Sequence, residues 1–168
     1  MIIKISNLSD GVHNYSFNEP VREIGLMEYF IENALAEVEL KKSHNQIIID
    51  AKLTLKANFE CDRCTSGFEQ IIETGYKMVY LFDNEPAEDS SINITYLPLE
   101  ADKINLDNDV KDFAILAVPM KKLCNEDCKG LCLKCGKNLN EGDCGCEKIK
   151  VDDRWLPLKD LKNKLNIN

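Results

Sequence analysis

Apolar and polar residues alternate over two long stretches in the first half of the chain. Residues 46–60, QIIIDAKLTLKANFE, are rich in β-branched side chains, and apolar residues recur at every second position near their end. Residues 68–82, FEQIIETGYKMVYLF, have the same character, and only CDRCTSG separates the two stretches. Two strands joined by a short turn that contains glycine form a β-hairpin. The pattern therefore predicts a long hairpin that carries Cys61 and Cys64 at its tip.

Shorter elements are predicted before this hairpin. Residues 2–5 and 12–17 have the character of short strands. Leu26, Tyr29 and Phe30 share one helical face at i, i+3 and i+4 spacing, which predicts a short helix over residues 25–33. The alternation in ALAEVELKK, residues 34–42, then favours a strand, with a continued helix as the competing interpretation.

Three further elements are predicted after the hairpin. Residues 83–91 are acidic and lack an apolar period, which indicates a solvated loop, and residues 92–99 return to strand character. Asp107 is placed to cap a helix near residues 108–117, which Pro119 ends. Leucines at i, i+3 and i+7 predict an amphipathic last helix. The apolar face of the middle helix comprises Val110, Phe113, Ala114 and Ala117, and that of the last helix comprises Leu158, Leu161 and Leu165.

These elements predict an α+β fold, in which an antiparallel sheet forms around the long hairpin with a few short helices. Residues 1–120 are expected to form this sheet domain. Residues 121–168 are expected to form a cysteine-rich zinc-knuckle segment with the C-terminal helix packed on it. The chain has 168 residues and 44% of them are hydrophobic, which is enough for one ordinary domain with a small appendage.

Charge and composition restrict the compartment and the partners. No stretch approaches the ~20 apolar residues of a membrane helix, and the N-terminus MIIKISNLSD lacks the apolar region of a secretory signal. We therefore expect a cytoplasmic protein with no membrane contact. The formal net charge is −8, divided into −11 over residues 1–120 and +3 over residues 121–168. Such a chain is not a general polyanion binder, because non-specific nucleic-acid affinity depends on dense Lys and Arg.

Eight cysteines carry the only obvious chemistry, and cytosolic thiols favour metal binding over disulfides. The CxxC of Cys132 and Cys135 and the CxC of Cys144 and Cys146 lie close enough in sequence to form one site. A CxxxC then remains after the middle helix, together with the CxxC of the hairpin tip. Four ligands per ion would make a second site from Cys61, Cys64, Cys124 and Cys128. An alternative grouping places Cys124, Cys128, Cys132 and Cys135 in one site.

The metal implied by these ligands is zinc, as one or two structural ions. Sites with four thiolates are saturated, whereas a catalytic zinc keeps an open position and its ligands usually include histidine. The only histidines are His13 and His44, far from the cysteines in sequence. A thiol oxidoreductase would carry its CxxC at a helix N-terminus, and this one joins two strands. No phosphate-binding or nucleophile motif is present, so we expect no enzyme and no small-molecule substrate.

The cysteine-rich region resembles a known family. LAVPMKKLCNEDCKGLCLKCGKNLNEGDCGCE, followed by VDDRWLPLKDL, is similar to the C-terminal signature of the YceD family, the large ribosomal RNA subunit accumulation proteins. The resemblance covers residues 53–165. Leu133 and Asp153 stand where the family commonly has proline, which affects turns but no ligand. The family's CxRC motif falls on Cys61, Arg63 and Cys64, its knuckle on Cys124, Cys128, Gly130, Leu131, Cys132, Cys135 and Gly136, and its N-L-N turn on Asn138, Leu139 and Asn140.

The resemblance implies a role in the synthesis, processing or stability of large-subunit ribosomal RNA. We expect a non-enzymatic factor that binds this RNA or a ribosomal protein through a zinc-braced surface. The alternatives are a protein-binding adaptor that uses the acidic N-terminal part without RNA contact and, with less support, an enzyme such as a nuclease or thiol oxidoreductase. The candidate contacts are basic residues around the cysteines: Arg63, Lys121, Lys122, Lys129, Lys134 and Lys137.

Overall fold

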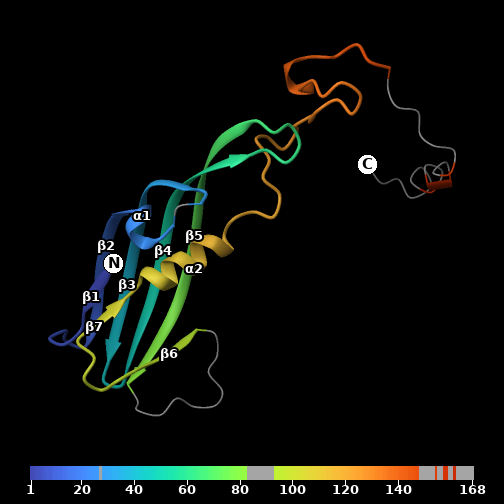
Figure 1. Cartoon of the computed structure of the whole chain (residues 1–168). Coiled ribbons are helices and arrows are strands. Elements are labelled where there is room, and N and C mark those ends of the chain that lie inside the picture. The colour runs from blue at the N-terminus through green and yellow to red at the C-terminus, as the bar shows by residue number, and fades with distance from the viewer. Residues whose placement is uncertain (27, 83–92, 148–153, 155–156, 159–160, 162–168) are drawn as a thin grey trace.

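A single five-stranded sheet forms the body of the protein in a computed structural model (Figure 1). The structure describes residues 1–168 except 27, 83–92, 148–153, 155–156, 159–160 and 162–168. The strand order is β2-β3-β4-β5-β6, and a separate two-stranded sheet pairs β1 with β7. The elements are β1 (Ile2–Lys4), β2 (Gly11–Pro20), α1 (Val21–Ile24), β3 (Phe30–Ser43), β4 (Gln46–Glu60), β5 (Gly67–Phe82), β6 (Ile94–Leu97), β7 (Lys103–Asn105), α2 (Asp107–Leu116) and the 3-10 helix η1 (Leu139–Glu141).

The predicted long hairpin is confirmed as β4 and β5. The two strands pair antiparallel along their whole length, from Gln46 opposite Leu81 to Glu60 opposite Gly67. The predicted early strands are β1 and β2, and the alternating residues 34–42 lie in β3 rather than in a continued helix. Only β6 departs from the antiparallel pattern, because it pairs parallel with the end of β5. The α+β class is therefore confirmed, with a mainly antiparallel sheet.

One face of the sheet is apolar and is covered by α1, α2 and the β1-β7 pair (Figure 1). Every second residue of β4 points into this core, and Ile47, Ile49 and Leu55 are at most 1% exposed. From the covering helix, Phe113 stacks on Tyr76 of β5 with ring centroids 4.7 Å apart. The alternation of apolar and polar residues in the sequence thus indicates a sheet that is buried on one face only.

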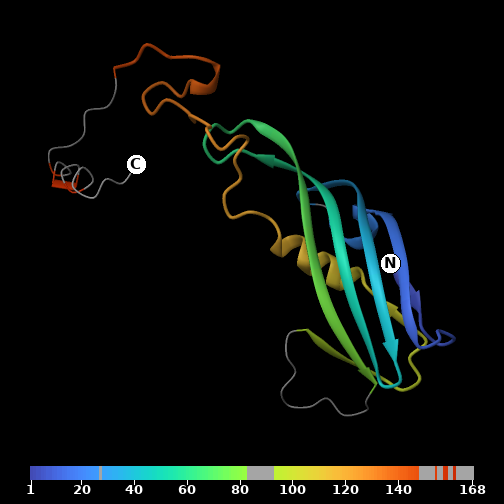
Figure 2. The same ribbon diagram turned by 180° about the vertical axis from the view of Figure 1, so that it is seen from behind.

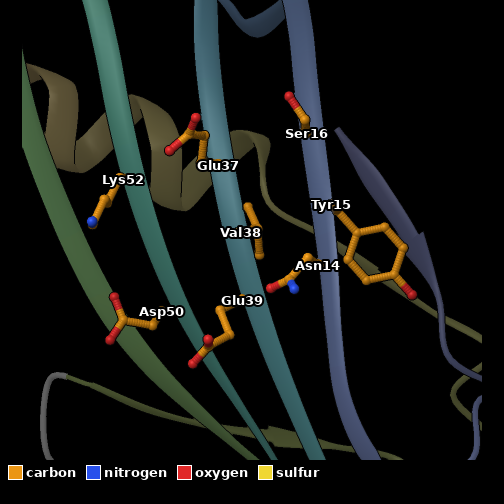
Figure 3. Close-up of a pocket in the computed structure, with 8 residues that line it drawn as sticks. All are labelled: Asn14, Tyr15, Ser16, Glu37, Val38, Glu39, Asp50 and Lys52. Carbon is orange, nitrogen blue, oxygen red and sulfur yellow. The ribbon is translucent and has the colours of Figure 1, made fainter.

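The other face of the sheet is solvated, and Figure 2 shows the strands from that side, in front of α2. A shallow hollow crosses β2, β3 and β4 there (Figure 3). Glu37, Glu39, Asp50 and Lys52 line it, and the Lys41 ammonium lies 2.6 Å from the Glu39 carboxylate. None of the candidate site residues from the sequence lies in this hollow. The polar residues that alternate with the apolar ones along these strands lie on this solvated face.

The helix predicted over residues 25–33 is wrong. The helix α1 comes earlier and ends at Ile24, because Gly25 takes a left-handed conformation with φ 80° and closes it. The next element is β3, which begins at Phe30. Its register shifts between Ile31 and Leu35, where Glu32 has φ 65°. The residues that suggested a helix, Leu26, Tyr29 and Phe30, precede this β-bulge. They lie in the bend before β3 and at its first residue, where Leu26 and Phe30 are buried in the same core.

The helix predicted near residues 108–117 is confirmed as α2, with Val110 and Ala114 buried, but the predicted cap is wrong. The backbone N–H of Asp107 donates to the side chain of Asn105, 3.0 Å away. The Asp107 carboxylate instead accepts from the amino group of Met1. Among the described parts of the chain, no helix is long and apolar enough to cross a membrane. The predicted loop at 83–91 and most of the predicted last helix lie outside the described residues. Leu158 and Leu161 of that helix are described, and both are exposed.

Glycine is required at position 75 by the closeness of the neighbouring strand. A Cβ atom there would lie 2.8 Å from the Ala51 carbonyl oxygen of β4. We predict that Gly75→Ala lowers the free energy of unfolding by about 1–3 kcal/mol, the usual cost of overpacking. Gly67→Ala in the same strand is the control, because its Cβ would meet nothing within 4 Å. Denaturant unfolding of both variants tests this, and equal stability of the two would contradict it.

Candidate metal centre

Four cysteines from two distant parts of the chain meet beyond the end of the sheet. We call Cys61, Cys64, Cys124 and Cys128 the tip cluster, and their sulfur atoms all lie within 4.8 Å of one another. The sulfur atoms of Cys61 and Cys128 are 3.8 Å apart, and those of Cys64 and Cys124 are 3.6 Å apart. A disulfide would need about 2.05 Å. Four thiolates bound tetrahedrally at about 2.3 Å from zinc would lie about 3.8 Å apart. The spacing fits a four-coordinate ion.

The β4-β5 turn holds its two cysteines in a tight loop. The N–H of Thr65 donates to the Cys61 carbonyl and the N–H of Cys61 donates to the Ser66 carbonyl, each at 2.9 Å. Thr65, directly after the CxxC, has φ 57°, so the chain turns back there toward β5. The sulfur atoms of Cys61 and Cys64 lie within 4.8 Å of each other. Cys61 and Cys64 are buried, and Phe68, Leu123 and Leu131 pack around them. The turn presents a preformed half of a metal site.

A pair of hydrogen bonds docks the second half onto this turn. The Asp62 N–H donates to the Lys122 carbonyl at 2.8 Å, and the Lys122 N–H donates to the Asp62 carboxylate at 2.7 Å. The Lys122 ammonium also lies 4.4 Å from the centre of the Tyr29 ring, a cation–π distance. Lys122 is therefore engaged within the protein, although the sequence made it a candidate partner contact.

Arg63 fastens the segment that carries the other two ligands of the tip cluster. Its guanidinium Nη1 donates to the carbonyls of Glu126 and Cys128, at 3.2 and 2.9 Å. Its own carbonyl accepts from the Leu131 N–H at 3.1 Å. A Cβ at Gly130 would come within 3.0 Å of that carbonyl, so the close approach requires glycine there. The arginine of the CxRC motif thus positions the Cys128 loop.

The remaining four cysteines form a second group on the C-terminal side. We call Cys132, Cys135, Cys144 and Cys146 the knuckle cluster, and their sulfur atoms also lie within 4.8 Å of one another. The Gly136 N–H donates to the Cys132 carbonyl at 2.8 Å, and φ at Gly136 is 74°, so the CxxC closes on itself. Cys135 is exposed and the other three are partly exposed, whereas three of the four cysteines in the tip cluster are buried.

Hydrogen bonds favour the thiolate form of some cysteines in both clusters, as the lowered pKa values of Cys61, Cys64 and Cys132 show. In the tip cluster, backbone hydrogen bonds lower the pKa of Cys61 to about 6, with the strongest contribution from Cys124. In the knuckle cluster, backbone hydrogen bonds from Cys135 and Lys134 lower the pKa of Cys132 to about 6. Hydrogen bonding to the neighbouring thiol of Cys64 raises the pKa of Cys124 to about 12. Four thiolates cannot all be charged side by side, and a divalent cation would relieve this repulsion.

Two asparagines of the loop between Cys135 and Cys144 contribute contacts that the sequence did not reveal. The side-chain amide of Asn140 donates to the Cys128 sulfur at 3.2 Å. The side-chain amide of Asn138 donates to the Ser66 hydroxyl of the hairpin turn at 3.3 Å. The N-L-N turn was recognisable as a motif, but nothing in the sequence indicated that it reaches the other cysteine cluster.

The basic residues do not form one uniform patch. Lys137 donates to the Asp143 carbonyl at 3.1 Å, and Lys121 is exposed before the tip cluster. An open groove of about 470 Å³ lies beside the knuckle cluster, and Lys129 and Lys134 line it. Leu133, between two cysteines of the knuckle, is 89% exposed at this groove. The rest of its lining is Leu131, Leu139, Asp143 and Glu147 with Cys132, Cys144 and Cys146.

The fold and the cysteines together define a class: a mainly antiparallel sheet whose hairpin tip completes one of two four-cysteine groups that could each hold a metal ion. A model of the family described as large ribosomal RNA subunit accumulation protein YceD matches residues 49–162. This range covers more than half of the chain and contains all eight cysteines. The chain belongs to the YceD family.

Individual relatives agree with this assignment. The chain is 33% identical over 70 residues to large ribosomal RNA subunit accumulation protein YCED homolog 1, chloroplastic, from Arabidopsis thaliana, covering 42% of this chain and 22% of the relative. The Zea mays protein of the same name is 36% identical over 65 residues, covering 38% and 22%. An uncharacterized protein of Mycobacterium bovis is 24% identical over 157 residues, covering 92% and 72%. The chain thus spans under a quarter of the plant relatives. No solved structure matches it.

We predict that replacing one cysteine of a cluster removes the ion of that cluster. Cys61→Ser and Cys144→Ser should each lower the metal content of the purified protein from two ions per chain to one, because three thiolates hold zinc far less tightly than four. The double variant should retain none. Elemental analysis after gel filtration measures this. Unchanged metal content in Cys61→Ser would favour the alternative grouping of Cys124 and Cys128 with the first knuckle pair.

Proposed function

We propose that this protein is a non-enzymatic factor that supports the synthesis, processing or stability of large-subunit ribosomal RNA. It acts by binding that RNA or a ribosomal protein through a surface that two structural zinc ions hold in shape. The observation that carries the proposal is the groove beside the knuckle cluster, where Lys129, Lys134 and Leu133 are displayed on a loop that the cysteines fix. Membership of the YceD family supports the link to the large subunit.

Zinc is the ion that best suits these ligands. Four thiolates are the usual donor set of structural zinc sites, and zinc needs no further ligand once they are bound. Reduced thiols require a reducing compartment, which supports a cytoplasmic location. With all four positions taken at each site, the ion brings no water to a substrate. It supplies folding free energy to a segment that has little apolar core.

A binding role also suits the surroundings of the other reactive groups. The CxxC of the tip cluster lies on a β-hairpin, away from any helix N-terminus that would make it a redox motif. On strand β2, in the opposite part of the molecule from the knuckle, the His13 ring donates from Nε2 to the Ser9 carbonyl at 2.9 Å. These surroundings support a factor without catalysis.

The adaptor is the second candidate, and the charge of the chain favours it. Residues 121–147 carry five basic and five acidic side chains. Each zinc site would add four thiolate charges against two on the ion, a net of −2, so the formal charge of the protein would move from −8 to about −12. A strongly acidic protein complements a basic ribosomal protein better than RNA.

Binding to large-subunit ribosomal RNA in a salt series tests the RNA contact. The variant Lys129→Gln/Lys134→Gln removes both lysines of the groove, and we predict an affinity lower by about tenfold at low salt. The slope of log affinity against log salt should fall by about 1.4–1.8, because each phosphate contact contributes about 0.7–0.9. Filter binding measures both quantities. Lys103→Gln, on the distant strand β7, is the control and should bind like wild type.

A pulldown with and without nuclease distinguishes a ribosomal protein from ribosomal RNA as the direct partner. A large-subunit ribosomal protein that remains bound after RNA is degraded supports the adaptor. Leu133→Ser should then weaken capture while the metal content stays at two ions, because the exposed leucine is not a ligand. RNA affinity unchanged in the double lysine variant would exclude the groove as the RNA contact.

A further inference from the structure

The loop that closes the knuckle cluster also supports the tip cluster. We call residues 136–143, between Cys135 and Cys144, the knuckle loop. Its residue Asn140 makes two contacts with the Cys128 segment: its Nδ2 donates to the Cys128 sulfur at 3.2 Å, and its Oδ1 accepts from the Lys129 N–H at 2.8 Å. A residue enclosed between ligands of one cluster is thus hydrogen bonded to a ligand of the other.

Further contacts fix the orientation of this amide. Asn138 Oδ1 accepts from the Asn140 N–H at 3.0 Å and from the Asn140 Nδ2 at 2.9 Å, so the two asparagines hold each other. The Leu139 N–H donates to the Gly130 carbonyl at 2.9 Å. Asn138 also reaches Ser66 in the hairpin turn. The knuckle loop therefore contacts both halves of the tip cluster.

In the described part of the chain, no apolar core holds the knuckle loop in place, so its position depends on these hydrogen bonds and on the cysteines at its ends. Its residues are exposed or partly exposed, and none belongs to a buried core cluster among the described residues. Its ends are Cys135 and Cys144, which lie within 4.8 Å of each other through their sulfur atoms. An ion bound by these thiolates would close the loop and reduce its conformational freedom. Metal binding at the knuckle cluster therefore also orders the loop that carries Asn140, and part of the binding free energy is spent on this ordering.

We propose that the two clusters are energetically coupled through Asn140, so that metal at the knuckle cluster strengthens metal binding at the tip cluster. The Asn140 amide stabilises the thiolate of Cys128 when the knuckle loop is closed, and it is not held there when the loop is open. Outer partners of metal ligands commonly change affinity by about 10–100-fold. Because coupling is reciprocal, metal at the tip cluster strengthens the knuckle cluster by the same factor.

Because the knuckle cluster is more exposed than the tip cluster, we expect the two ions to be lost in a fixed order. The knuckle cysteines are the more accessible, so a chelator or a competing protein removes that ion first. The buried tip ion then loses the Asn140 hydrogen bond and is held less tightly. The proposal rests on metal binding at both clusters, and it does not depend on the identity of the partner.

A cobalt titration of the full chain tests the coupling, because Co²⁺ bound by four thiolates has an intense absorption band. We predict that Cys144→Ser/Cys146→Ser, which disables the knuckle site, lowers the Co²⁺ affinity of the tip cluster by about tenfold. Asn140→Asp should lower it similarly with all eight cysteines present. A carboxylate keeps the acceptor for the Lys129 N–H but cannot donate to the Cys128 sulfur. Adding Asn140→Asp to the double serine variant should cause no further loss of Co²⁺ affinity at the tip cluster.

The control is Glu141→Gln, which alters charge in the same turn and leaves both Asn140 contacts in place; it should bind Co²⁺ like wild type. If Cys144→Ser/Cys146→Ser misfolds, the shapes of the Co²⁺ titration curves of wild type and Asn140→Asp still test the coupling. Wild type should fill both sites together, and Asn140→Asp should fill them in two separate phases. A tip affinity within twofold of wild type in Asn140→Asp would overturn the coupling. Fewer than two ions in the wild-type protein would instead overturn the metal sites themselves.

Discussion

The meeting of the hairpin tip with the segment around Cys124 and Cys128 is the constraint on which the rest of the functional region depends. The segment enters at Lys122, where it is aligned by a reciprocal pair of hydrogen bonds with Asp62. Its cysteines then lie within tetrahedral reach of the two on the turn. This contact ties the described segment of residues 121–147 to the end of the sheet.

The region around the tip cluster has few apolar residues. In the part of the chain that the structure describes, Phe68, Leu123 and Leu131 are the hydrophobic side chains that pack around its buried cysteines. So small a core offers far less burial than a segment of this length needs to stay ordered. Thiolates bound to an ion would supply the missing free energy, and they would do so without covering the surface. Leu133 and the lysines of the groove can therefore stay exposed on a rigid loop.

The sequence predicted the elements whose signals are local and repetitive. The period-two pattern identified β4 and β5, and the spacing of CxxC and CxC motifs suggested the same two groups of cysteines that the structure brings together. It could not predict the β-bulge at Glu32, because the two extra residues of β3 between Ile31 and Leu35 leave the alternation of buried positions in step on both sides. Nor could it predict the contacts of Asn140 and Arg63. Both depend on which loops lie side by side, and this is fixed only when the distant cysteines meet.

The sheet and the cysteine clusters have separate interiors. Phe68 is the one partly buried residue that packs against both, and the rest of the large core lies under α1, α2 and the β1-β7 pair. If zinc occupies both clusters, the end that displays the groove would depend on the ions, while the sheet would form and persist without them. The cell would then hold a reserve of folded but incompetent protein whenever zinc is scarce. Metal availability, rather than synthesis of the chain, would set how much working factor is present.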